Sequence, residues 1–410
     1  MWLNLNFLSW LVLIVGAIHC QAYVHHTFAV KATPYTRLCS TKNILTVNGQ
    51  FPGPALHVHQ GDTIFVDVHN QGTTIHGAII IHPKKGTKYP FPLPHAEVPI
   101  IFGEWWKQEI LAIYDETIYT GGAPDVSDAY TINGQPGVLY PCSKPDLLRL
   151  INSAVMDILF FAIAKHNVTV VGTYGSYTKP LESSYVTISP SQTIDVLLKA
   201  NQKSYHYYMA TKAYSVAPGV AYDNTTTTAI LEYNGNYTPS SPPSLPNNLP
   251  YFNNTNASVS FTINTFPCPN NSRAWPNGMR LATSVNNISF VDPYIYILQA
   301  YYGHVIGVFG TNFPDFPPYL FNFTAEDLPL YLETPRHGTK VKILKYNTTM
   351  ELVFQGTTLV CGNDHPMHLH GYSFYVVGMG LGNFDKDKDP LRYNLVEPPP
   401  MNTIDVPLDG

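Results

Sequence analysis

The feature that most constrains the fold of this 410-residue chain is the alternation of apolar and polar residues in its informative segments. Residues 63–69 (TIFVDVH) place apolar side chains at every second position, the period of a β-strand whose two faces differ. Short turns separate such segments, and the Asn-Gly pairs that predict β-hairpins begin at Asn48, Asn133 and Asn234. With 35 prolines and few long amphipathic helical windows, the chain is predicted to be all-β.

Three further segments are predicted to form strands. Residues 341–346 (VKILKY) and 350–354 (MELVF) alternate in the same way. Residues 147–165 are long enough for a helix, but we predict two strands that separate near Asn152 and Ser153.

A weak internal repeat indicates more than one domain. Residues 47–53 (VNGQFPG) are echoed by residues 132–137 (INGQPG) and more faintly by residues 285–290 (VNNISF), which predicts three related β-barrel domains. The predicted divisions are a signal peptide at 1–22, a first domain at 23–92, a second at 93–236, a Pro-, Ser- and Asn-rich linker at 237–256, and a third domain at 257–410. The first of these is short of the roughly 100 residues typical of such a domain.

The N-terminus predicts secretion. Residues 7–18 form an apolar run of signal-peptide length, followed by small residues that predict cleavage near Ala22. The run is shorter than the roughly 20 residues that span a membrane, and no other membrane segment is predicted. Charged residues make up 12% of the chain and its net charge is −5, which argues against nucleic acid or an anionic membrane as a partner.

Two further counts fit an oxidising, extracellular compartment. Nine N-x-S/T sequons are candidate glycosylation sites, at Asn167, Asn224, Asn236, Asn253, Asn256, Asn270, Asn287, Asn322 and Asn347. Four cysteines remain after the predicted cleavage, Cys39, Cys142, Cys268 and Cys361, and they can pair in three ways.

The densest candidate site lies at residues 364–371 (DHPMHLHG), just before the β-forming run at 372–377. His365, His368 and His370 have the side chains that most often bind copper, zinc or iron. In a strand, residues two apart share a face, so His368 and His370 are predicted to point the same way.

This motif, H-P-x-H-x-H-G, resembles the third copper motif of the multicopper oxidases. Residues 47–54 (VNGQFPGP), 102–106 (FGEWW) and 130–134 (YTING) are similar to the plant laccases in particular. The resemblance extends along essentially the whole chain after the signal peptide.

The resemblance implies three cupredoxin-like Greek-key β-barrels and four coppers per chain. It also implies oxidation of phenols and monolignols coupled to reduction of O2 to water, often in lignin formation or breakdown, in the apoplast or cell wall. By position in the motif, His365 matches a type 1 copper ligand, His368 a type 2 ligand and His370 a type 3 ligand. Cys39 matches a family cysteine that bridges to one like Cys142, whereas the state of Cys268 and Cys361 stays open.

The chain departs from the family pattern at the other copper motifs. The two histidine motifs of the first domain are expected after Thr74, but Thr74 runs directly into Ile75-His76-Gly77. The fourth motif, H-C-H-x-x-x-H, is expected beyond Pro407, and the sequence given ends at Gly410. We therefore expect the first and third domains to be incomplete and the 410-residue form to lack laccase turnover.

The remaining histidines do not replace these motifs. His57-Val58-His59 has H-x-H spacing on a predicted strand, but its position differs from that of any family ligand, so we predict a solvated strand face. Isolated histidines are predicted to be surface or packing residues, namely His82, His95, His304 and His337.

Three alternatives remain at this point. The chain could be a secreted, non-enzymatic pseudo-oxidase that binds copper through His365, His368 and His370, or an enzyme similar to ascorbate oxidase. A zinc hydrolase fits least, because no carboxylate lies at motif spacing from the histidines. The missing segments have two explanations, a mis-assembled gene model and decay of the gene. The natural phenol and the oligomeric state are not determined by the sequence.

Overall fold

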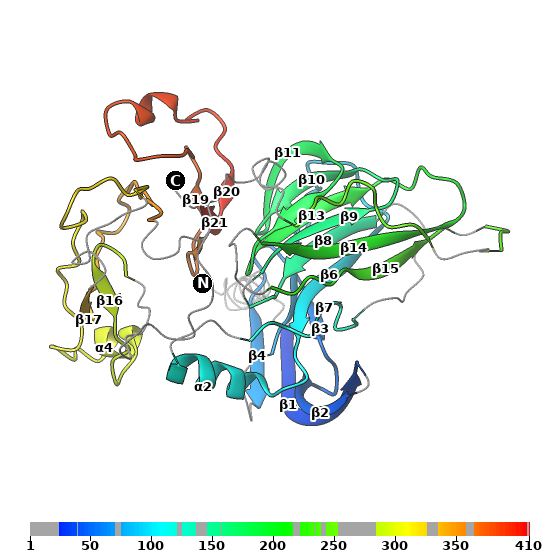
Figure 1. Cartoon of the computed structure of the whole chain (residues 1–410), viewed down its shortest axis with the longest axis horizontal. Helices are drawn as coiled ribbons and strands as arrows, with labels where there is room; N and C mark the ends of the chain where they lie inside the picture. The colour runs from blue at the N-terminus through cyan, green and yellow to red at the C-terminus, as the bar shows by residue number, and fades with distance from the viewer. Residues whose placement is uncertain are drawn as a thin grey trace, which may run out of the picture.

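The computed structural model describes residues 24–38, 40–69, 75–120, 125–136, 146–155, 157–215, 222–233, 235–238, 243–252, 284–325, 335–357, 365–407 and 410. Strands dominate this part of the chain, as predicted, and its principal core lies between two sheets in the middle of the sequence (Figure 1). None of the described helices is both long and apolar enough to cross a membrane.

The larger sheet of this central unit has six strands in the order β11-β10-β13-β8-β6-β7. These strands are β6 (Ala96–Trp105), β7 (Ala129–Ile132), β8 (Asp146–Asn152), β10 (Val168–Thr173), β11 (Ser176–Ser183) and β13 (Thr193–Leu198). The opposing sheet has the order β12-β9-β14-β15 and consists of β9 (Ile158–Ile163), β12 (Val186–Ile188), β14 (His206–Tyr214) and β15 (Thr227–Glu232). Strands β8 and β9 confirm the prediction that residues 147–165 form two strands rather than a helix.

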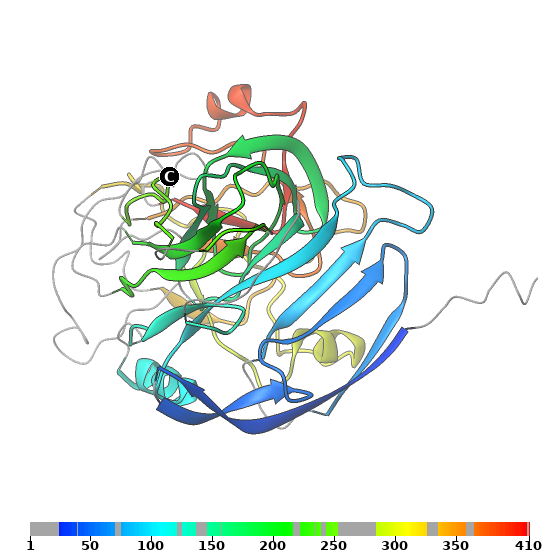
Figure 2. The same cartoon turned by 90° about the vertical axis from the view of Figure 1, so that its right-hand side faces the viewer.

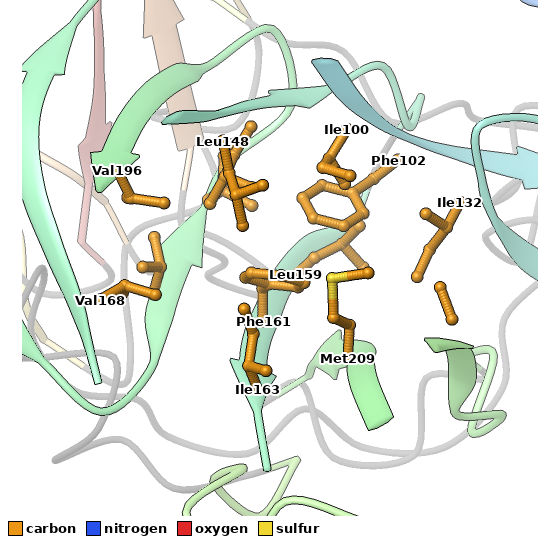
Figure 3. Packing of buried hydrophobic residues seen from close by; sticks show 14 of the residues in the cluster. Ile100, Phe102, Ile132, Leu148, Leu159, Phe161, Ile163, Val168, Val196 and Met209 are labelled. Carbon is orange, nitrogen blue, oxygen red and sulfur yellow. The ribbon is translucent and has the colours of Figure 1, made fainter. Parts of the chain in front are cut away.

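The two sheets face each other across the main hydrophobic core. Figure 3 shows Phe102 and Leu148 from the six-stranded sheet directed toward Leu159, Phe161 and Met209 from the other sheet. Phe102 and Leu159 have no solvent-exposed surface, so this core is fully dehydrated at its centre.

The repeated Asn turns adopt the same conformation at all three positions. Asn48-Gly49, Asn133-Gly134 and Asn286-Asn287 all have positive φ at both residues, the geometry of a tight hairpin turn. Isolated bridges close each turn, joining Val47 to Gln50, Ile132 to Gln135 and Val285 to Ile288. The faint third copy of the repeat therefore has the same local structure as the other two. The predicted turn at Asn234 lies outside the described residues.

The N-terminal strands form two small sheets beside the central unit, drawn in blue in Figure 2. One has the order β2-β1-β4, from β1 (Val24–Arg37), β2 (Ser40–Val47) and β4 (Ile64–His69). The other is a parallel pair of β3 (Gly53–His59) and β5 (Gly77–His82). Ala78 and Ile80 of β5 are buried against Ile101 of β6, which attaches this pair to the central unit.

Two helices were not part of the all-β prediction. Helix α2 (Ile110–Thr120) contains no glycine or proline and has good helix formers at Leu111, Ala112 and Glu116. Of its apolar residues, Ile113 is buried. The helix is three turns long, too short for its periodicity to stand out among strand patterns. Helix α4 (Ile297–Tyr302) is a single short helix in the C-terminal part.

The C-terminal part contains only short ladders among the described residues. They pair β16 (Ile288–Phe290) with β17 (Arg336–Gly338), β18 (His365–His368) with β21 (Thr403–Val406), and β19 (Phe374–Tyr375) with β20 (Pro400–Met401). A 3-10 helix, η2 (Asp389–Arg392), precedes β20. The yellow β16–β17 pair lies well apart from the green sheets, whereas β19, β20 and β21 lie beside them (Figure 1).

Two strand predictions in this part are wrong. Residues 341–346 and 350–354 alternate in sequence but form no strand, and Ile343, Leu352 and Tyr346 are exposed. A strand needs a neighbour to satisfy its backbone groups, and no described strand lies against these segments. The run at residues 372–377 likewise forms only the two residues of β19.

Candidate metal centre

The ladder of β18 with β21 positions the histidine motif. The two strands are antiparallel, with His365 opposite Val406 and His368 opposite Thr403. His365 and His368 are three residues apart in this strand, so they project from opposite faces. The motif therefore does not present its three imidazoles on one surface.

His368 and His370 are brought together, as predicted, but for a different reason. Strand β18 ends at His368, and His370 lies in the turn that follows. Their ring centroids are 4.7 Å apart with the planes nearly perpendicular. The turn, rather than strand periodicity, makes them neighbours.

The hydroxyl of Thr403 orients the ring of His368. Thr403 is buried on β21, and its Oγ1 lies 2.7 Å from Nδ1 of His368. The same hydroxyl donates to Oδ1 of Asn402 at 3.2 Å. Since the hydroxyl proton is used by Asn402, the hydroxyl accepts the Nδ1 proton of His368 and leaves the lone pair on Nε2. This is the tautomer that binds a metal through Nε2.

His365 stands apart from this pair. Its side chain reaches the surface, yet the surrounding protein removes part of its water, and this desolvation lowers its pKa. Neutral imidazole is the metal-binding form. In the part of the chain that the structure describes, no three His, Cys, Asp or Glu side chains are arranged around a common point that could hold a metal.

The strand beneath the motif is anchored to the central unit. Oδ2 of Asp405 on β21 accepts a hydrogen bond from the Ser189 hydroxyl, and the Tyr174 hydroxyl donates to the Thr403 carbonyl at 3.5 Å. Thr173 adds a bond to the carbonyl of Pro400 at 3.0 Å. Burial raises the pKa of Asp405 to about 6, and the bond from Ser189 opposes that shift. The strand that pairs with the histidine motif is therefore held against the central unit by these contacts.

Several predicted residues lie outside the described part of the chain. These are Cys39, Cys142, Cys268 and Cys361, so the predicted Cys39–Cys142 disulfide stays a prediction, and the sequons at Asn253, Asn256 and Asn270. Asn287 is half-buried, and the other described sequons are exposed, at Asn167, Asn224, Asn236, Asn322 and Asn347.

A second group of histidines was not predicted from the sequence. His82 was expected to stand alone, but Nε2 of His82 lies 3.2 Å from Nδ1 of His57. The rings of His59 and His82 are 5.4 Å apart. The isolation of His82 in sequence gave no sign of these neighbours, because they depend on the pairing that places β5 beside β3. His57 and His59 do lie on a strand, as predicted.

Comparison with known proteins assigns the family. Models described as multicopper oxidase match residues 29–89, 96–236 and 312–410. Laccase-14 of Arabidopsis thaliana is 44% identical, over 94% of this chain and 84% of the relative, and Laccase-3 of Oryza sativa subsp. japonica is 39% identical, over 98% and 88%. The chain belongs to the multicopper oxidase family and, within it, is a homologue of the plant laccases.

The fold comparison agrees. The crystal structure of the laccase from Botrytis aclada matches with a TM-score of 0.56 at 17% identity, over 95% of this chain and 81% of that structure. Together with the three family models, this match assigns three cupredoxin domains to the chain, as the resemblance implied.

Proposed function

We propose that this laccase homologue, in its 410-residue form, is a secreted protein that binds copper through His368 and His370 without reducing O2. The single observation that carries this proposal is the short connection between β4 and β5. Strand β4 ends at His69 and β5 begins at Gly77, so residues 70–76 alone join them. The two histidine motifs of a laccase first domain belong in this region, and residues 70–76 contain a single histidine.

That histidine serves packing. The ring of His76 lies 5.3 Å from Phe51 in an edge-to-face contact. Burial lowers the pKa of His76, which fits a neutral ring in an apolar environment. It cannot replace two missing pairs of ligands.

The alignment with the Arabidopsis laccase supports an internal gap. It extends over 483 positions, more than the 410 residues of this chain. The relative therefore has residues within the aligned stretch for which this chain has no counterpart.

The histidine motif at residues 365–370 fits one copper ion rather than four. His368 has an oriented Nε2 lone pair and His370 lies beside it, so this pair would hold a copper ion, which supplies one-electron redox capacity when bound. A four-copper centre needs a cysteine and many more imidazoles than the motif provides. We therefore derive no step of oxygen reduction for this form.

Oxidation of phenols coupled to reduction of O2, with a lignin-related role in the cell wall, is proposed for a longer form that contains the missing motifs. Sequencing of the transcript across Thr74–Ile75 and beyond Gly410 decides between the two forms. A continuous reading through Thr74–Ile75 supports the copper-binding role. Additional codons for histidine pairs at that junction would instead support ordinary laccase activity and contradict the copper-binding role.

The copper-binding role is tested on the full chain secreted from a eukaryotic host. Copper(II) is titrated by calorimetry into the wild type and into His368→Ala/His370→Ala, with the exposed pair His304→Ala/His337→Ala as a matched control. We expect the first double variant, and not the control, to lose one equivalent of bound copper. An unchanged stoichiometry would refute the role of His368 and His370. Oxygen uptake with a phenolic substrate, above that of free copper, would refute the absence of turnover.

A further inference from the structure

We propose that His57, His59 and His82 form a second binding site for an imidazole-preferring divalent metal ion, zinc or copper(II), separate from the motif at His368 and His370. This site does not depend on the proposed function of the copper motif.

Strand register puts the three imidazoles on one face. In the parallel pair of β3 and β5, His59 lies opposite His82 and His57 lies opposite Ile80. Residues two apart in a strand share a face, and partners in a ladder do as well. Ile80 is buried beneath β6, whereas His57 is exposed. The three histidines thus lie at the edge of the part of this face that β6 covers, where an ion from solvent can reach them.

The spacing of the first two ligands suits a metal ion. Nδ1 of His57 and Nε2 of His82 are 3.2 Å apart. Two nitrogens bound to one tetrahedral zinc at about 2.0–2.1 Å lie about 3.3 Å from each other. In the metal-free protein one of these nitrogens donates a hydrogen bond to the other, and a metal ion would take the place of that proton once His57 adopts its other tautomer. The two rings are inclined by only 17°.

His82 is held in the orientation that a ligand needs. Its Nδ1 faces the Tyr89 hydroxyl at 3.4 Å and Oε2 of Glu97 at 3.5 Å. A carboxylate on one imidazole nitrogen directs the lone pair of the other nitrogen outward, the arrangement found behind most metal-bound histidines.

The carboxylate behind His82 is itself fixed. Glu97 accepts bonds from the Tyr89 hydroxyl at 2.5 Å and from Arg149 at 2.9 Å, and Arg149 also bonds both carboxylate oxygens of Asp195 at 3.0 and 3.1 Å. Arg149 is buried, so this network forms a rigid base for His82. His82 is therefore a ligand preorganised by the protein.

His59 supplies the third nitrogen. Its Nδ1 lies 3.5 Å from Oδ2 of Asp62, and its side chain is 41% exposed. The described side chains do not yet converge as a three-ligand group, so His59 completes the site by rotating toward His82, whose ring is 5.4 Å away. Three imidazoles favour zinc or copper over magnesium or calcium, which prefer oxygen ligands.

The test uses the full chain with His365→Ala, His368→Ala and His370→Ala as the background, so that the copper motif cannot contribute. Zinc and copper(II) are titrated separately by calorimetry, and the copper-loaded protein is examined by electron paramagnetic resonance for nitrogen hyperfine structure. We expect one equivalent of either metal. Adding His57→Ala and His59→Ala should abolish it, and adding the exposed His95→Ala, a matched control, should leave it unchanged.

Two further measurements distinguish the loss of metal ligands from a loss of folding. His57 and His59 reach the surface, so their removal should leave the thermal melt of the metal-free protein unchanged. Glu97→Gln keeps the ligands but weakens the carboxylate behind His82, and we expect about a 10- to 100-fold loss of metal affinity. Absence of binding in the background protein, or binding that survives loss of His57 and His59, would overturn the proposal. If copper fails to bind at His368 and His370 in the wild type, the proposal for His57, His59 and His82 is not affected.

Discussion

Replacing Asp405 with Asn should remove a pH-dependent loss of stability that arises at the contact between β21 and the central unit. Asp405 is 7% exposed, its Oδ2 accepts a bond from Ser189, and its Oδ1 has no hydrogen-bond partner among the described residues. A buried carboxylate with a free oxygen is costly when ionised. Burial accordingly raises the pKa of Asp405 from 3.8 to about 6.

The size and sign of the expected change in unfolding free energy follow from this shift in pKa. The folded protein holds the proton more tightly than the unfolded chain, so the contribution of Asp405 is most favourable below about pH 4 and is lost as the pH rises through 6. A shift of about two pKa units corresponds to about 3 kcal/mol of unfolding free energy. Asn does not titrate, so the difference between Asp405→Asn and the wild type should rise by about 2 kcal/mol in favour of the variant between pH 4 and pH 7, because part of the titration of the unfolded chain lies below pH 4.

Urea unfolding followed by tryptophan fluorescence, at half-unit steps from pH 4 to pH 7, measures this difference. Ser189→Ala serves as a second variant, because loss of the hydroxyl donor should raise the pKa of Asp405 further and steepen the pH dependence. A difference between Asp405→Asn and wild type that does not change with pH would refute the reasoning, since it would mean that Asp405 is hydrated and that β21 does not dock against the central unit.

Three further substitutions test other parts of the structure. Leu150→Ala empties a site with no exposed surface in the main core and should cost about 2–5 kcal/mol in the urea unfolding free energy. Arg149→Ala leaves the partly buried carboxylates of Glu97 and Asp195 without their cationic partner and should cost about 3–5 kcal/mol by the same assay, whereas Arg149→Lys keeps the charge and should cost less. Thr403→Val keeps the shape but removes the hydroxyl that orients His368, and calorimetry should show about a 10- to 100-fold loss of copper affinity at that motif.

The candidate copper motif was predictable because it is local in sequence. His368 and His370 are separated by one residue, and any tight turn or strand keeps them close. Their environment was not predictable. The partner of His368 is Thr403, which lies on β21 and reaches the motif only through the ladder with β18.

The cluster of His57, His59 and His82 shows the opposite case. His82 is remote from His57 in the chain, and its neighbours in sequence are apolar or basic. Only the register of β3 with β5 brings the rings together, and Glu97, Tyr89 and Arg149 add a supporting network from three other places in the chain. A pattern search along the sequence has no signal for such a group.

The amino-acid sequence by itself determined the β class, the division near Asn152 and the conformation of the three Asn turns. These features depend on local sterics and on the period of apolar residues, which act within a few neighbouring positions. It also determined membership of the family, through motifs that are continuous in the chain.

Tertiary structure decided which alternating segments became strands. Residues 64–69 alternate and pair with β1 as strand β4, whereas residues 350–354 alternate as well but find no partner and stay irregular. It also decided the raised pKa of Asp405 and the meeting of His57 with His82. Pairing, burial and ligand convergence depend on what lies opposite a residue in space, and a linear pattern does not contain that information.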